Sequence, residues 1–300
     1  MAESAQPLVS VIIPVYNDAA RLGRCLAALE SQAWPRDRLE VIVVDNGSTD
    51  DLGSVLDVFP AVVRERELRP GSYAARNRGL GAARGELLAF TDSDCLPEPG
   101  WVAAGVGELV AHPDVGIVGG RVDLRAADPR RPNAVELHEL LWGFPQEAYV
   151  TAERYSVTAN LFTRRTVMDR VGQFNPALKS GGDREWGTRA AAAGVAIRFA
   201  PDAVVGHPAR RTLAELGHKV RRVAGGRADR IRRQSGPVRL RLLRDVLVSL
   251  RPPITAIPRI VRDPRVRPGA AARVVAVAFS VRYRTAWERL RLLLGAASAR

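Results

Sequence analysis

The amino-acid sequence predicts an α/β fold: a Rossmann-like, mostly parallel sheet flanked by helices, with a basic α-helical C-terminal extension. First, short apolar and β-branched runs alternate with helix-like segments between residues 8 and 119, which is typical of parallel sheets covered by helices. Second, three of these runs end in polar residues. Third, the basic residues are concentrated in the last third of the chain, which predicts a separate region there.

The apolar runs predict five strands, at residues 8–15, 40–44, 61–64, 87–90 and 115–119. Asn17 or Asp18 can cap the first helix, whose buried face is Leu22, Cys25, Leu26 and Leu29. Ser48 or Thr49 can open a short second helix. Further helices are expected at residues 73–84, after Gly71 and ending at Gly85, and at about 101–111.

Polar side chains stand at the ends of three expected strands. Tyr16 and Asn17 follow the first strand, Asp45 ends the second, and Asp92 and Asp94 follow the run at 87–90. Ligands of open α/β sheets bind outside the carboxyl ends of the strands, and two carboxylates one residue apart can hold a hard divalent cation. The pattern predicts a nucleotide crevice with a metal at its mouth. The glycine motifs of dinucleotide folds and phosphate loops do not occur, which disfavours those two classes.

The composition is that of a globular protein in a reducing compartment. Cys25 and Cys95 are too few for a disulfide framework and have no metal-finger spacing. The N-terminus does not resemble a signal peptide, and no uninterrupted apolar stretch reaches roughly 18 residues. We therefore expect a cytoplasmic protein without a spanning helix.

The net charge of +13 is unevenly distributed. Residues 209–300 contain 23 Lys/Arg and 5 Asp/Glu, a net charge of +18, whereas residues 1–208 carry −5. We therefore expect a catalytic domain at 1–208 and a basic helical region at 209–300. Its helices are marked by three apolar stripes: Leu213, Leu216, Val220 and Val223; Val238, Leu242, Val246 and Leu250; and Phe279, Tyr283, Trp287 and Leu290.

Three partners are compatible with these basic amphipathic helices. They suit an anionic membrane surface, which would place the protein peripherally on the inner face of the cytoplasmic membrane. The stripes could equally pack on the catalytic domain or on a partner subunit. Nucleic acid is a third alternative because phosphates attract arginine, but no specific nucleic-acid motif is present.

Four motifs occur in a fixed order along the chain. They are ValSerValIleIleProValTyrAsnAsp (9–18), ValIleValValAspAsnGlySerThrAsp (41–50), AlaAlaArgAsnArgGly (74–79) and PheThrAspSerAspCys (90–95). Together they closely resemble the family 2 glycosyltransferases of the GT-A fold, over roughly residues 8 to 207. The resemblance implies an inverting enzyme that uses a nucleotide-diphosphate sugar and a divalent cation, Mg²⁺ or Mn²⁺.

The resemblance also implies roles for residues of the donor site. Pro14 and Tyr16 would line the nucleotide base, and Asp45 would hydrogen-bond the base or ribose. Arg76 would reach the base or the diphosphate, although it could also be a solvated helix arginine. Asp92, with Ser93, would face the ribose or the sugar.

Asp94 would bind the metal, and His207 would be a further ligand. A histidine near the end of the domain completes the metal site in many GT-A enzymes, and a neutral imidazole can serve beside a carboxylate. A lone histidine is more often structural, so both readings of His207 stay open.

Residues 123–153, with prolines at 129, 132 and 145, are expected to be irregular and resemble the family's variable acceptor region. Trp142, Phe144 and Tyr149 could form an acceptor platform or belong to the local core. The segment 156–165 resembles the family's buried strand before its acceptor loop.

The sequence GlyGlyAspArgGluTrpGlyThrArg at 181–189 is expected to start a helix that runs to Gly194, with Asp183 as its N-cap. The family has a Glu-Asp pair here, and Gly182 replaces the Glu. Asp183 matches the family's catalytic base, Glu185 is the alternative within reach, and a purely capping Asp183 is a third reading. Gly181, Gly182 and Trp186 would contact the acceptor.

The sequence thus predicts a glycosyltransferase of the hexosyltransferase type, acting on a UDP-sugar by preference. Its acceptor would be a hydroxyl of a glycan or lipid-linked molecule in cell-envelope polysaccharide or glycolipid synthesis. A second hypothesis is an inactive nucleotide-sugar-binding protein of the same fold, which the Gly182 departure supports. A third makes the basic region primary, as a module that binds a membrane surface or nucleic acid.

Overall fold

The computed structural model describes residues 6–233 and 235–298, which divide into two compact units. The first unit contains the described residues up to Asp123, together with Phe144–Ala177 and Gly182–His207. The second contains Leu124–Gly143, Leu178–Gly181 and the described residues from Pro208 onward. Two mid-chain segments therefore belong with the C-terminal region, which the expected division at residue 208 does not anticipate.

The described residues form an eight-stranded sheet of order β3-β2-β1-β4-β7-β6-β8-β5. The strands are β1 (Val9–Val15), β2 (Leu39–Asp45), β3 (Val63–Arg66), β4 (Leu87–Phe90), β5 (Leu96–Pro97), β6 (Val115–Arg125), β7 (Leu161–Arg164) and β8 (Ala196–Pro208). The first four in this order pair in parallel, whereas β7 is antiparallel to β4 and β6, and β5 is antiparallel to β8. The α/β fold class is confirmed, with a sheet that is parallel in one half and mixed as a whole.

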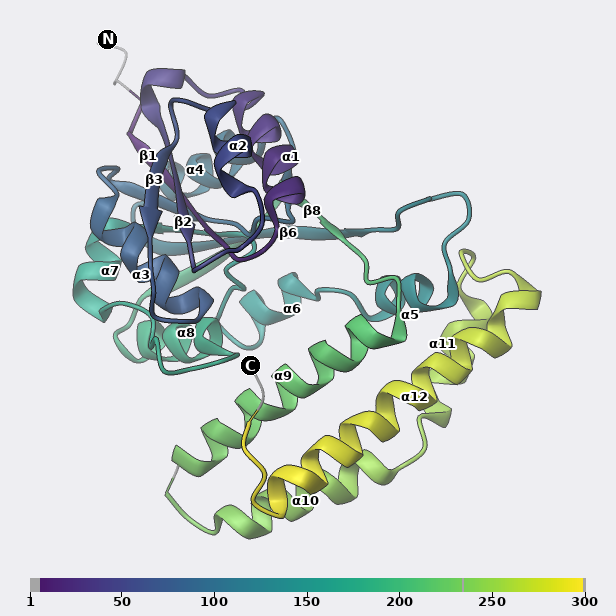
Figure 1. Cartoon of the computed structure of the whole chain (residues 1–300). Helices are drawn as coiled ribbons and strands as arrows, with labels where there is room; N and C mark the ends of the chain where they lie inside the picture. Colours follow the sequence, from purple (N-terminus) through teal and green to yellow (C-terminus); the bar gives the residue numbers. More distant parts are fainter. Residues whose placement is uncertain (1–5, 234, 299–300) are drawn as a thin grey trace. The chain divides into compact units, whose positions relative to one another are not determined.

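Helices cover both faces of the parallel half (Figure 1). On one face, α1 (Ala19–Glu30), α2 (Leu52–Asp57) and α4 (Trp101–Ala111) share a core with the odd-numbered residues of β1. Successive strand residues point to opposite faces, so Ile12 meets α3 (Ser72–Ala82) on the other side. Gly79 permits this close approach, because a Cβ there would lie 2.5 Å from the Ile12 Cγ2. The remaining elements of this unit are a 3-10 turn at Arg36–Arg38, α6 (Gln146–Thr151), α7 (Arg165–Val171) and α8 (Gly182–Ala192).

Several expected boundaries differ from those observed. The third strand begins at Val63 rather than at residue 61. Neither Ser48 nor Thr49 opens α2, because Asp51 is its N-cap and accepts a hydrogen bond from the Ser54 N–H at 3.2 Å. Asp18 occupies the N-cap position of α1, but its side chain makes no capping hydrogen bond. The segment expected as a strand at 156–165 is extended only over β7.

The expectation that residues 123–153 are irregular is wrong. This segment contains α5 (Ala134–Trp142) and α6, and the prolines lie outside both helices. Asn133 and Glu136 form a capping box at the start of α5, in which each side chain accepts the other's backbone N–H. The prolines mark helix boundaries here rather than an unstructured loop.

The second unit is a helical assembly of α5, α9 (Leu213–Arg233), α10 (Val238–Leu250), a 3-10 turn at Ile254–Ala256, α11 (Ile257–Arg262) and α12 (Pro268–Leu293). Helices α9, α10 and α12 lie side by side, and α12 also contacts α5 and α11 (Figure 1). Part of the expected stripes of α9 and α10 is buried within this unit: Leu216, Val220, Leu242 and Val246. The stripe expected on α12 is wrong, since Tyr283 and Trp287 are exposed and Val274, Ala278 and Ala286 are buried instead.

Two buried carboxylates of this unit are paired with cations. Asp245 of α10 accepts hydrogen bonds from Nε and Nη2 of Arg227 through its two carboxylate oxygens. Glu139 of α5 accepts from Lys219 Nζ at 2.7 Å and from Arg210 Nη1 at 2.8 Å. Although burial opposes it, this pair of cations holds the pKa of Glu139 at about 2. Among the described residues, no helix combines the length and apolarity that crossing a bilayer would require.

Candidate active site

The carboxyl ends of three parallel strands meet at one edge of the sheet in the first unit. Val15 of β1 pairs with Asp45 of β2, and β4 ends beside Ile12 of β1. Tyr16 follows β1 and is 63% exposed at this edge, whereas Pro14 is buried within the strand. The sheet therefore leaves Tyr16 accessible to a ligand, whereas the side chain of Pro14 is enclosed within the strand.

Hydrogen bonds fix the turn that follows β2. Asp45 Oδ1 accepts the Ser48 N–H at 2.7 Å. The Asn46 side chain donates to the Glu67 carbonyl oxygen at 2.8 Å and accepts the Gly71 N–H at 2.7 Å. These bonds connect the end of β2 to the segment that leads into α3, so Asp45 lies on a braced turn at the edge of the sheet.

Asp92 and Arg76 form an ion pair in which the Arg76 side chain is only 4% exposed. The guanidinium carbon lies 5.7 Å from the centre of the Tyr73 ring, and Nε has no hydrogen-bond partner among the described residues. The reading of Arg76 as a solvated helix arginine is therefore wrong. Its guanidinium instead fixes the position of Asp92, whose carboxylate is one-third exposed.

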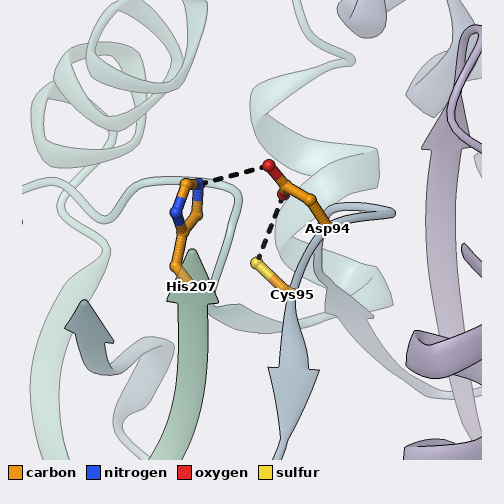
Figure 2. Close-up of side chains that lie close together, drawn as sticks. All are labelled: Asp94, Cys95 and His207. Atoms are coloured by element: carbon orange, nitrogen blue, oxygen red, sulfur yellow. Dashed lines mark hydrogen bonds and ion pairs between the residues drawn. The ribbon is translucent and has the colours of Figure 1, made fainter. Parts of the chain in front are cut away.

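Asp94 and His207 come together, as Figure 2 shows, from the loop after β4 and from β8. His207 Nε2 lies 3.7 Å from Asp94 Oδ2, and the Cys95 Sγ lies 4.0 Å from Asp94 Oδ1. The three side chains form a group that could hold a metal ion. Burial raises the pKa of Asp94, against the opposing effect of His207, and the nearby carboxylates of Asp92 and Asp18 raise it further. A cation here would favour the charged carboxylate.

The donor atoms suit a hard or borderline cation better than a soft one. A carboxylate oxygen and an imidazole nitrogen are accepted ligands for Mn²⁺, and carboxylate oxygen for Mg²⁺. Cys95 is fully buried, burial raises the pKa of its thiol far above the ordinary value, and a thiolate is a softer ligand than either of these cations prefers. Asp94 and His207 are therefore the ligand candidates, and Cys95 packs beside them.

Asp18 is a site residue that the sequence analysis considered only as a helix cap. Its Oδ2 accepts the Ser93 hydroxyl at 2.9 Å, and its Oδ1 pairs with Arg21 Nε at 2.6 Å. Ser93, the middle residue of the AspSerAsp motif, thus donates its hydroxyl to Asp18. The position of Asp18, directly after the first strand end, is the signal that could have identified it.

The first turn of α8 carries the two candidate bases. The helix begins at Gly182, so Asp183 lies inside the first turn and is not the N-cap. Asp183 Oδ1 accepts the Arg184 N–H at 2.8 Å and lies 3.5 Å from the Tyr73 hydroxyl. Glu185 is bound by Arg189 of the same helix at 2.8 and 3.2 Å.

The two other residues expected at the acceptor are Trp186 and Gly181. Trp186 is fully buried and its indole N–H donates to the Gly172 carbonyl oxygen at 2.9 Å, so it belongs to the core beneath α8. Gly181 has a positive φ of 74° and falls in a segment of the second unit.

Comparison with known proteins identifies the family. The family model for glycosyl transferase family 2 matches residues 10–174, more than half of the chain. The chain belongs to glycosyl transferase family 2. The glycosyltransferase AglE of Haloferax volcanii is 39% identical over 212 residues, which are 69% of this chain and 69% of that relative. The pre-mycofactocin glycosyltransferase of Mycobacterium tuberculosis is 32% identical over 218 residues, or 69% of this chain and 44% of that protein.

Solved structures agree on the fold. The mannosyltransferase PcManGT from Pyrobaculum calidifontis, in complex with GDP-Man and Mn²⁺, is similar with a TM-score of 0.61 and 23% identity, over 95% of this chain and 88% of that one. TarS of S. aureus (residues 1–349) is similar with a TM-score of 0.57 and 17% identity, over 96% of this chain and 92% of that one. These structures confirm the GT-A fold, and the family match with the named relatives confirms the assignment as a transferase enzyme.

In this family 2 glycosyltransferase, the Gly182 departure from the Glu-Asp pair has a local cause. The Tyr73 hydroxyl accepts the Gly182 N–H at 2.8 Å and the Asp183 N–H at 3.4 Å. A Cβ at residue 182 would lie 2.7 Å from two carbons of the Tyr73 ring. Tyr73, a residue that the sequence analysis did not single out, therefore occupies the space that any side chain at 182 would need.

The three aromatic residues considered as an acceptor platform each have their own packing partner. Tyr149 stacks on Tyr155 with ring centres 4.9 Å apart. Trp142 belongs to the second unit, where the Arg259 guanidinium lies 5.4 Å from its ring. Phe144 packs on His207 with ring centres 5.1 Å apart, so only Phe144 borders the candidate metal ligands of this glycosyltransferase.

Proposed function

We propose that this glycosyltransferase moves a sugar from a nucleotide-diphosphate sugar to a hydroxyl acceptor, with inversion and with Asp183 as the general base. The observation that carries the proposal is the gathering of Tyr16, Asp45, Asp92 and Asp94 at the carboxyl edge of the parallel strands, with His207 beside Asp94. Ligands of open α/β sheets bind at this edge.

The donor would lie along this edge. Tyr16 is exposed and can stack on the base, and Asp45 can accept a hydrogen bond from the base or ribose. Asp92, positioned by Arg76, would face the ribose or sugar. The complex of PcManGT with GDP-Man supports a nucleotide-sugar donor, and a UDP-sugar remains the donor favoured by the sequence analysis.

Asp94 and His207 would hold a divalent cation, Mg²⁺ or Mn²⁺. Their oxygen and nitrogen donors lie 3.7 Å apart, and the Asp94 carboxylate is only one-quarter exposed. When bound, such an ion neutralises the diphosphate leaving group. The Mn²⁺ in the PcManGT complex is consistent with this proposal.

The proposed reaction is a single displacement. Asp183 removes the proton from the acceptor hydroxyl while that oxygen bonds to the anomeric carbon and the bond to the diphosphate oxygen breaks. Burial raises the pKa of Tyr73, so its hydroxyl stays protonated and can orient Asp183 Oδ1 across 3.5 Å. Glu185 is the less favoured base because both of its carboxylate oxygens are bound to Arg189.

The acceptor would belong to cell-envelope polysaccharide or glycolipid synthesis, with the protein in the cytoplasm and peripheral to the inner face of the cytoplasmic membrane. The basic second unit supports this location. The alternative of an inactive binding protein rests on the glycine at position 182. It is not favoured, because packing against Tyr73 accounts for that glycine and leaves Asp183 in place as the base.

Calorimetric titration with UDP, GDP and dTDP, with and without Mn²⁺, tests the donor site. The proteins are wild type, Asp94→Asn and the control Asp37→Asn, whose side chain is exposed on a 3-10 turn. We expect tight binding of one nucleotide that requires Mn²⁺ and is lost in Asp94→Asn but not in the control. If none of the three nucleotides binds under either condition, the donor-site assignment is wrong.

A further inference from the structure

Helix α10 carries a second apolar stripe that faces away from the core of its unit. Its buried side is formed by Leu242, Asp245, Val246 and Ser249. On the other side, Leu240, Leu243, Leu247 and Leu250 are 64%, 42%, 57% and 51% exposed. At about 100° per residue these four leucines fall within an arc of about 80°, so they form one continuous row along the helix.

Arginines border this row on both sides. Arg239 lies along one edge of the leucine row and Arg244 along the other, and Arg251 follows the end of the helix. All three side chains are exposed, and none makes a hydrogen bond or an ion pair with a described residue. The exposed face of α10 is thus apolar along its centre and positively charged at its margins.

The charges indicate which partner fits this face. The one carboxylate of α10, Asp245, is buried and bound to Arg227; it also attracts Arg244, which helps to lower the pKa of Asp245, but it makes no ion pair with any of the three exposed arginines. Pairing with the same face of a second copy would place arginine against arginine. Helices that pair through rows of leucines need complementary charges beside those rows, so a second copy fits this face poorly. An anionic lipid surface accepts both components, because leucines enter the acyl boundary while arginines reach the headgroups.

We propose that the exposed face of α10, formed by Leu240, Leu243, Leu247 and Leu250 with Arg239, Arg244 and Arg251, binds the surface of an anionic bilayer. The inference deepens the membrane location in the proposed function and is independent of the catalytic residues. The helix lies in the plane of the interface and does not cross it, in keeping with its short length and polar buried side.

Co-sedimentation of the full chain with lipid vesicles tests the proposal. The vesicles contain phosphatidylcholine alone, or phosphatidylcholine with phosphatidylglycerol. The first variant is Leu243→Gln with Leu247→Gln. The second is Arg239→Gln with Arg251→Gln, which removes only unbonded surface groups and so should leave folding intact. The controls are Val110→Gln on α4, where Val110 is 58% exposed, and Arg24→Gln on α1.

We expect wild type and both controls to bind the anionic vesicles and to bind phosphatidylcholine alone far more weakly. The leucine variant should lower the partition coefficient about tenfold, and the arginine variant several-fold, with a weaker response to salt. Nucleotide titration of the same variants should match wild type. Loss of vesicle binding with intact nucleotide binding therefore separates this surface from the donor site.

Four results would overturn the proposal. Wild type could fail to bind anionic vesicles, or both variants could bind them as wild type does. Equal binding to neutral vesicles would exclude the role of the arginines. If light scattering finds a dimer that the leucine variant converts to a monomer, with vesicle binding unchanged, the face is instead a self-association surface.

Discussion

The contact between Tyr73 and Gly182 makes a specific prediction about stability. Replacing Gly182 by alanine adds one methyl group where its Cβ would lie 2.7 Å from the Tyr73 Cε2 and Cζ atoms. The ring cannot move away freely. It is 6% exposed, packs 5.9 Å from the Phe174 ring centre, and is bound through its hydroxyl to the Gly182 N–H.

The expected cost follows from two opposing effects. Overpacking of a well-packed site typically costs about 1–3 kcal/mol. Alanine in place of glycine in a helix returns roughly 0.5–1 kcal/mol when space is available. From the middle of each range, the net loss for Gly182→Ala is about 1 kcal/mol, which corresponds to a fall in Tm of about 2–4 °C for a domain of this size.

Thermal unfolding followed by circular dichroism measures this shift, with Gly107→Ala as the matched control. Gly107 lies in α4, where an added Cβ meets nothing within 4 Å, so this variant should be neutral or slightly stabilising. In a Tyr73→Ala background, Gly182→Ala should no longer destabilise the protein, which gives a coupling energy of about 2 kcal/mol between the two sites.

The reasoning is refuted if Gly182→Ala raises the Tm as much as Gly107→Ala does. It is also refuted if the loss at residue 182 is the same with and without the Tyr73 ring. Either result would mean that Tyr73 does not determine the residue beside the proposed base.

Three further predictions concern the base, the metal and the response to acid. Asp183→Asn should keep wild-type nucleotide affinity in calorimetry and lower kcat by about 10²–10⁴-fold, measured as nucleoside diphosphate release, with a smaller effect for Glu185→Gln; full turnover by Asp183→Asn would contradict the base assignment. Chelation with EDTA should lower the nucleotide affinity of wild type to that of Asp94→Asn and should change that variant little; an unchanged wild-type affinity would argue against the metal. The pKa of Glu139 is lowered from an ordinary value of 4.5 to about 2. Its contribution to the free energy of unfolding, up to about 3 kcal/mol, is therefore fully present above pH 4.5 and is lost as the pH falls toward 2. Urea unfolding measured at intervals of about one pH unit between pH 6 and pH 2 should show this loss in wild type and a flatter response in Glu139→Gln. Identical pH profiles of the two proteins would exclude the effect.

Local sequence was sufficient where an element depends on short-range patterns. The strand at Leu87–Phe90 and the helix at Trp101–Ala111 have the expected bounds, and the buried face of α1 contains the four expected residues. Periodicity predicts such elements because side-chain direction repeats within them. The acidic strand ends also follow from sequence, since parallel strands present their carboxyl ends at one edge.

Local patterns failed where partners far apart in sequence decide the outcome. Trp186 is a residue type that could contact an acceptor, but the core encloses it and its indole N–H donates to the Gly172 carbonyl oxygen. The stripe expected on α12 includes Trp287, yet its packing partners on α5, α9 and α10 select another face. Arg76 could be either a solvated arginine or a ligand-binding one, until Asp92, sixteen residues along the chain, is seen beside it.

The sequence by itself determined the α/β class, the family, the order of the donor-site motifs and the uneven charge, because each is written in neighbouring residues. The tertiary structure decided that Tyr73 occupies the space beside Gly182, that Asp18 receives Ser93, and that α10 has an outward leucine row with unbonded arginines. These features depend on which side chains meet across 75 or 109 residues of chain, or on which face of a helix its neighbours leave uncovered. Packing in three dimensions, and not local periodicity, sets both.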